Sequence, residues 1–130
     1  MDTWQVNNNN GLYEICSGSI SFICQIGSGG VIEATKKNEG DRCTPSGFWH
    51  LKSIYYRADK INNQDLISNS FLSLKKITKN CIWCDDYKSD NYNQYFKINK
   101  NGKVFPFSYE KLWREDGVYD IFIELGFNDN

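Results

Sequence analysis

Short segments rich in β-branched and aromatic residues recur along this 130-residue chain, and turn-forming residues separate them. The clearest segments lie at 12–26 and 118–125, where apolar and polar residues partly alternate. Alternation with a period of two is typical of strands, and no stretch sustains the period of an amphipathic helix. The pattern therefore predicts an all-β fold, a β-sandwich or barrel, with at most short helical turns.

Turn signals and alternation also place the individual elements. We expect a hairpin over 12–26, a strand over 48–56, and the best-defined strand over 118–125. Alternation within 48–56 assigns Lys52 and Tyr55 to opposite faces of that strand.

Other segments are predicted to be irregular or helical. Residues 81–93 are dense in aromatic residues, Asp and Asn and predict a loop. Ser108 is a suitable N-cap for one helical turn over 108–113. The first residues are polar and turn-forming, so we expect a flexible N-terminal segment at 1–11 and one domain over 12–130.

The charge balance excludes some classes of partner. The chain has 15 Lys and Arg against 16 Asp and Glu, a net charge of −1. A nucleic-acid partner held by a strongly basic surface is therefore not expected. No apolar run is long enough to span a membrane. Residues 1–6 lack the features of a secretory signal, so the sequence leaves the compartment open.

The cysteines do not form a metal-site pattern. There are five, an odd number that favours reduced, buried thiols. Cys81 and Cys84 form a C-x-x-C pair, but a structural zinc needs four ligands and no second pair exists. We therefore expect no metal and no cofactor. Two enzyme hypotheses remain open: a thiol enzyme that uses Cys84 with His50, and a glycosidase that uses paired carboxylates.

Several motifs follow one another in a distinctive order: Phe22–Gly27, Lys37–Asp41, Thr44–Gly47, Tyr55–Lys60, Trp83–Asp86, Tyr92-Asn93, Leu112–Asp120 and Gly126–Asp129. This ordered set resembles the L,D-transpeptidase catalytic domain of the YkuD type (the ErfK/YbiS/YcfS/YnhG family). The resemblance extends from about residue 12 onward. Its most specific parts are the Tyr-Arg-Ala-Asp, Trp-Cys-Asp-Asp and Leu-Trp-Arg-Glu-Asp segments.

The resemblance implies a β-sandwich enzyme of the bacterial envelope. The family cross-links peptidoglycan stem peptides through a cysteine acyl-enzyme, with a histidine that activates the thiol. In the family, the histidine and the Gly-Cys nucleophile follow the segment that matches 126–130, and no Gly-Cys dipeptide occurs here. We therefore expect a C-terminally incomplete, inactive domain with no catalytic residue and an unpaired strand edge near Leu125. A complementing C-terminal chain is a possible partner.

Six polar and aromatic residues are the candidates for a substrate groove: Trp83, Asp85, Asp86, Arg114, Glu115 and Asp116. Arg114 could hold a substrate carboxylate through two parallel hydrogen bonds. The competing interpretation of residues 114–116 is an ion-pair network that fixes a turn. Two further functions are weighed against the transpeptidase-like one: a non-catalytic module that binds peptidoglycan or glycan, and an inert gene remnant.

Overall fold

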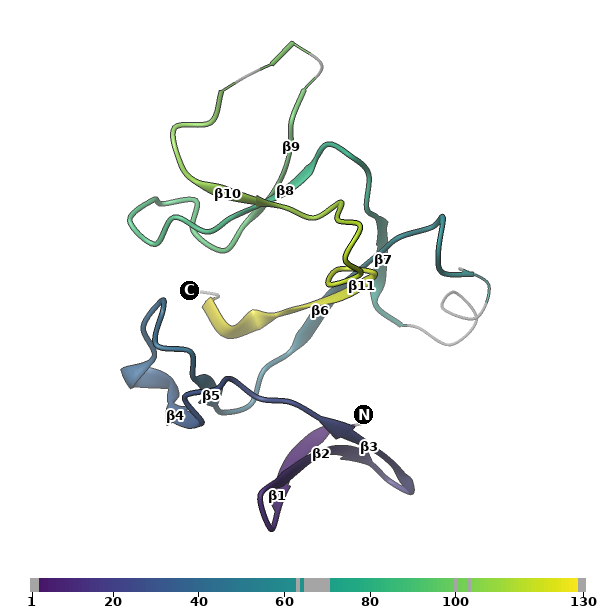
Figure 1. Ribbon diagram of the computed structural model, residues 1–130, viewed down its shortest axis with the longest axis vertical. Coiled ribbons are helices and arrows are strands. Elements are labelled where there is room, and N and C mark those ends of the chain that lie inside the picture. The colour runs from purple at the N-terminus through teal and green to yellow at the C-terminus, as the bar shows by residue number, and fades with distance from the viewer. Residues whose placement is uncertain (1–2, 63, 65–70, 100, 103, 129–130) are drawn as a thin grey trace. The chain divides into compact units, whose positions relative to one another are not determined.

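A computed structural model describes residues 3–62, 64, 71–99, 101–102 and 104–128 (Figure 1). These residues form eleven strands and two short 3-10 helices, which confirms the all-β prediction. None of the helices in this part of the chain has the length and apolar character needed to cross a membrane. The chain divides into two compact units, residues 1–48 and 49–130.

The first unit contains a three-stranded antiparallel sheet in the order β1-β2-β3. Its strands are β1 (Gln5–Asn9), β2 (Leu12–Ser17) and β3 (Ile20–Cys24). Val6, Ile15 and Phe22 lie opposite one another in the register and therefore share one face. This face also carries exposed apolar area, because Val6 and Phe22 are both exposed.

Two predictions concern this sheet. The hairpin expected over 12–26 is confirmed by β2 and β3, which meet at Gly18 with a φ of 56°. The segment 1–11, which we expected to be flexible, contains strand β1. The reason is the Asn10-Gly11 pair, whose φ values of 53° and 90° suit a tight hairpin turn.

The rest of the first unit is a small parallel pair, β4 (Val31–Glu33) and β5 (Thr44–Ser46), with a 3-10 helix η1 (Ala34–Lys36) after β4. Gly27 allows the backbone to pass closely, since a Cβ there would lie 2.2 Å from the carbonyl oxygen of Arg42.

The second unit contains two three-stranded sheets (Figure 1). In the first, β6 (Leu51–Tyr56) lies between antiparallel β11 (Ile121–Leu125) and parallel β7 (Ser73–Lys76). Strands were expected where β6 and β11 occur, so both predictions are confirmed. A 3-10 helix η2 (Gly126–Asn128) follows β11 directly.

In the other sheet, β8 (Cys81–Cys84) is central between β9 (Tyr95–Lys97) and β10 (Tyr109–Lys111). Two predictions are wrong here. Residues 81–84 form a strand rather than part of a loop, and the helical turn expected to begin at Ser108 is replaced by β10. The Ser108 hydroxyl donates to Asp85 Oδ1 at 2.6 Å instead of capping a helix. Pairing with distant strands outweighs local preference in such short segments.

The core of the second unit joins these two sheets. Its fully buried members are Tyr55 from β6, Cys81 from β8, and Ile77 and Leu112 from adjacent connections. Partly buried aromatic residues pack around them: Trp83, Tyr95, Trp113, Tyr119 and Phe122. Burial of this aromatic area stabilises the second unit.

Candidate functional site

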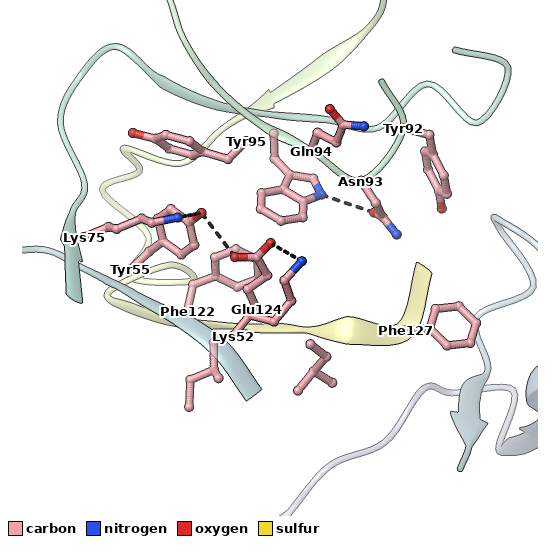
Figure 2. A pocket seen from close by; sticks show the side chains of 13 residues that line it. Lys52, Tyr55, Lys75, Tyr92, Asn93, Gln94, Tyr95, Phe122, Glu124 and Phe127 are labelled. Carbon is pink, nitrogen blue, oxygen red and sulfur yellow. Dashed lines mark hydrogen bonds and ion pairs between the residues drawn. The ribbon is translucent and has the colours of Figure 1, made fainter. Parts of the chain in front are cut away.

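A cavity of about 620 Å³ lies within the second unit, between residues of the two sheets (Figure 2). Strands β6, β7 and β11 contribute one side, and β8 with residues 92–95 contributes the other. Residues that are far apart in sequence therefore meet here, and a concave pocket of this kind is the default candidate for a ligand site.

Aromatic rings form the walls of this cavity. Tyr55 and Phe122 are cross-strand partners on one sheet, and Trp83 and Tyr95 are cross-strand partners on the other. The two pairs meet: the Trp83 ring lies 5.1 Å from Phe122 at 87° and 6.3 Å from Tyr55 at 88°. These edge-to-face contacts are favourable for aromatic quadrupoles and hold the walls in place.

A chain of polar groups crosses the cavity (Figure 2). Lys75 Nζ donates to the Tyr55 hydroxyl at 3.1 Å, and that hydroxyl donates to Glu124 Oε2 at 3.4 Å. Glu124 Oε1 also pairs with Lys52 Nζ at 3.6 Å. Two ammonium groups and one carboxylate thus line the cavity, so its charged side chains sum to a positive charge.

An irregularity in strand pairing brings Lys52 to this face. Ile123 lies opposite Ile54, but Leu125 lies opposite Leu51, so β6 uses one more residue than β11 over this interval. A bulge of this kind changes the face on which the following side chain lies. The prediction that Lys52 and Tyr55 occupy opposite faces is therefore wrong, since both side chains reach the Glu124 carboxylate.

Tyr55 and Tyr95 remain protonated over the ordinary pH range, because each has a raised pKa. Burial raises the pKa of Tyr55, and the negative charge and hydrogen bond of Glu124 raise it further. Burial also raises the pKa of Tyr95, together with its hydrogen bond to the Cys81 thiol at 3.1 Å. Both phenols are therefore neutral hydrogen-bonding groups rather than bases.

Trp83 is the one predicted site residue that lines the cavity. Its Nε1–H donates to Asn93 Oδ1 at 3.2 Å, which fixes the orientation of the indole. Asn93 has a left-handed backbone with a φ of 59°, and its N–H donates to the Cys84 carbonyl at 3.0 Å. Asparagine tolerates this conformation better than most residues.

Asp85 and Asp86 were also predicted to line the site, but neither is among the residues that surround the cavity. Asp85 accepts a hydrogen bond from the Ser108 hydroxyl, and Asp86 Oδ1 accepts one from the Lys88 backbone N–H at 3.0 Å. In the described structure, these carboxylates hold the loop that follows β8.

Arg114, Glu115 and Asp116 lie after β10 and form the network considered as the alternative. Arg114 Nε donates to both carboxylate oxygens of Asp116, at 3.1 and 3.0 Å, and Nη1 reaches Glu110 at 3.4 Å. These contacts raise the pKa of Arg114 and lower that of Asp116. Glu115 accepts the indole N–H of Trp113 at 3.2 Å. The guanidinium thus binds carboxylates of its own chain.

Sequence reasoning missed the buried arginine that holds this segment. Arg57 is 2% exposed and binds Asp59 through two hydrogen bonds, of 2.9 and 2.7 Å. Its Nη1 donates to the Arg114 carbonyl at 2.6 Å, and the guanidinium lies 3.5 Å from the centre of the Trp113 ring. The Arg-x-Asp spacing within Tyr-Arg-Ala-Asp was the available signal.

The cysteine hypotheses find little support. Cys81 and Cys84 are three apart on one strand, so their side chains leave opposite faces. The described residues contain no cluster of three or more metal-ligating side chains. Cys84 is fully buried, whereas His50 is exposed, so the thiol is not open to a substrate.

Comparison of the chain with protein-family models, with curated proteins and with solved structures gives no match. The functional argument therefore depends on the motifs and on the geometry of the cavity.

Proposed function

We propose that this chain is an L,D-transpeptidase-like β domain of the YkuD type that binds peptidoglycan stem peptides in the cavity of its second unit. In this proposal, the two sheets of that unit are the layers of a β-sandwich. The residues of the cavity serve binding rather than acyl transfer, since no cysteine or histidine is among those that line it. A nucleophile and base would have to come from another segment or chain.

One observation carries the proposal: three of the segments that carry the resemblance, Tyr55–Lys60, Trp83–Asp86 and Leu112–Asp120, contact one another. Tyr55 and Trp83, from the first two motifs, face each other across the cavity. Arg57, from the first motif, donates to the Arg114 carbonyl and stacks on Trp113, both from the third. Tyr55 and Trp83 line the cavity, and the Arg57 contacts tie the third segment to the end of β6.

The chemistry of the cavity suits a peptide. Aromatic walls bury aliphatic side chains, and amide and charged groups at the margin bind peptide N–H and C=O groups. Asn93 and Gln94 supply such amides among the lining residues. A glycan-binding module would use the same aromatic rings. Competition experiments must therefore distinguish a peptide ligand from a glycan.

The test is sedimentation with isolated peptidoglycan, followed by competition with soluble stem peptide or with glycan strands that lack peptide. We expect stem peptide to compete and Trp83→Ala to abolish binding. Asn93→Gly removes the amide that orients the indole, keeps the left-handed backbone, and should weaken binding severalfold. Trp4→Ala, in the first unit, is the matched control and should bind normally.

Three results would contradict the proposal. Peptidoglycan that does not retain the wild-type chain would favour an inert remnant. Competition by glycan strands alone would favour the glycan-binding module. Equal binding by Trp83→Ala and the wild type would place the contact outside the cavity.

A further inference from the structure

We propose that the cavity recognises a ligand carboxylate and that Lys75 is its anchor. The role of Lys75 is inferred from the geometry of the cavity. The identification of the natural ligand as a stem peptide rests on the function proposed above. The inference begins with the charges that line the cavity: Lys52, Lys75 and Glu124.

Lys52 and Glu124 neutralise each other, since their charged atoms lie 3.6 Å apart. The excess positive charge is therefore that of Lys75. Within the described ranges, no carboxylate forms an ion pair with Lys75, whose one hydrogen-bond partner there is the neutral Tyr55 hydroxyl at 3.1 Å. An ammonium group has further N–H donors, which are available to a ligand.

Aromatic rings hold this ammonium in the cavity. Lys75 Nζ lies 4.9 Å from the centre of the Tyr55 ring and 5.9 Å from that of Tyr95. Cation–π attraction compensates part of the hydration that Lys75 loses. The register fixes the position, because Lys75 is the cross-strand partner of Tyr55. A partly buried cation that makes no direct ion pair in the described structure is a suitable complement for an anion.

The surroundings favour a carboxylate over a phosphate. A phosphate dianion is usually held by arginine or by several donors. The described residues that line the cavity include no arginine, and among their cations only Lys75 lacks a direct ion pair. The rings of Trp83 and Phe122 offer apolar area to the rest of the ligand. The ligand class is therefore a molecule with a free carboxylate beside apolar groups, and a peptide C-terminus is one such group.

The experiment compares N-acetyl-D-alanyl-D-alanine with its C-terminal amide by titration calorimetry on the full chain. The two probes differ only in the charged group. We expect the acid to bind about tenfold more tightly, the size of one partly exposed charge-assisted hydrogen bond. Added salt should weaken binding of the acid alone.

Variants assign this preference to Lys75. Lys75→Gln keeps a hydrogen-bond donor but loses the charge, and it should bind acid and amide equally. Lys75→Arg should restore the preference for the acid. Lys88→Gln is the matched control, because Lys88 lies 5.5 Å from the Tyr87 ring but outside the cavity, and the preference should be unchanged.

Several results would overturn the anchor: equal binding of acid and amide by the wild type, an unchanged preference in Lys75→Gln, or binding of neither probe at about 10 mM. Inorganic phosphate that binds as tightly as the acid would overturn the assignment to a carboxylate. A preserved acid preference together with failure to bind peptidoglycan would refute the proposed function and leave the anchor intact.

Discussion

The Tyr55 hydroxyl links Lys75 to Glu124, so Tyr55→Phe tests the polar chain of the cavity with the smallest change. The side chain is 1% exposed, and its ring contacts are retained in phenylalanine. The variant loses one hydrogen bond of 3.1 Å from a charged donor and one of 3.4 Å, near the limit of useful length.

The magnitude follows from these two contacts. A hydrogen bond to a charged group contributes about 1.5–3 kcal/mol when buried, but water can solvate the partly exposed Lys75 in the variant. Because of this solvation we expect a loss at or below the bottom of that range, about 1–1.5 kcal/mol in the free energy of unfolding. For a unit of this size, that corresponds to a fall in Tm of about 5–10 °C.

The assay is urea unfolding, monitored by tryptophan fluorescence. Tyr95→Phe is the matched variant, because among the described residues the Tyr95 hydroxyl has only the Cys81 sulfur as a partner, at 3.1 Å. Sulfur is a weak hydrogen-bonding group, so we expect a loss of about half a kcal/mol. Equal stability of Tyr55→Phe and the wild type, or a larger loss in Tyr95→Phe, would refute the reasoning.

Three other features give predictions. Hydrogen bonding to Lys37 lowers the pKa of Asp41 from 3.8 to about 2, so the stability that the charged carboxylate contributes is complete above about pH 4 and is lost as the pH falls through 2. NMR shifts of the 37–43 loop should follow this titration, and Asp41→Asn should remove it. Arg57→Lys should lower the Tm measured by calorimetry by several degrees, because an ammonium cannot bind Asp59 through two parallel bonds or stack on the Trp113 indole. An unchanged Tm would contradict a stabilising role for the buried guanidinium. In the described sheet, β11 is an edge strand, which can pair with the edge of another chain, and Ile123 on this strand is 42% exposed. Ile123→Lys should therefore reduce aggregation measured by light scattering. Unchanged scattering would contradict aggregation through this edge.

Alternation and turn residues predicted the longer strands because these signals are local. The hairpin of β2 and β3 and the strand β11 depend on residue types within each segment. The short strands β8 and β10 could not be predicted in this way. They form because Cys84 pairs with Tyr109 across 25 positions of sequence, and local preference pointed to a loop and a helical turn.

The cavity shows a similar limit. Trp83 was predicted from its motif, but the polar residues that line the cavity with it come from other strands: Tyr55 from β6, Lys75 from β7 and Glu124 from β11. Periodicity gives the face of each strand and not which strands are neighbours. The bulge in β6 then moves Lys52 to the face that alternation excluded. Arg114 and Asp116 are hydrogen-bonded to each other, which sequence alone does not show.

The most direct test of the account is an NMR titration of the tryptophan indole N–H groups with soluble peptidoglycan stem peptide. The Trp83 N–H bonds to Asn93 at the cavity, whereas the Trp113 N–H bonds to Glu115 outside it. The account predicts a saturable shift of the Trp83 signal, assigned with Trp83→Phe, and a nearly constant Trp113 signal. A constant Trp83 signal, or equal shifts of both, would contradict binding of the peptide in this cavity.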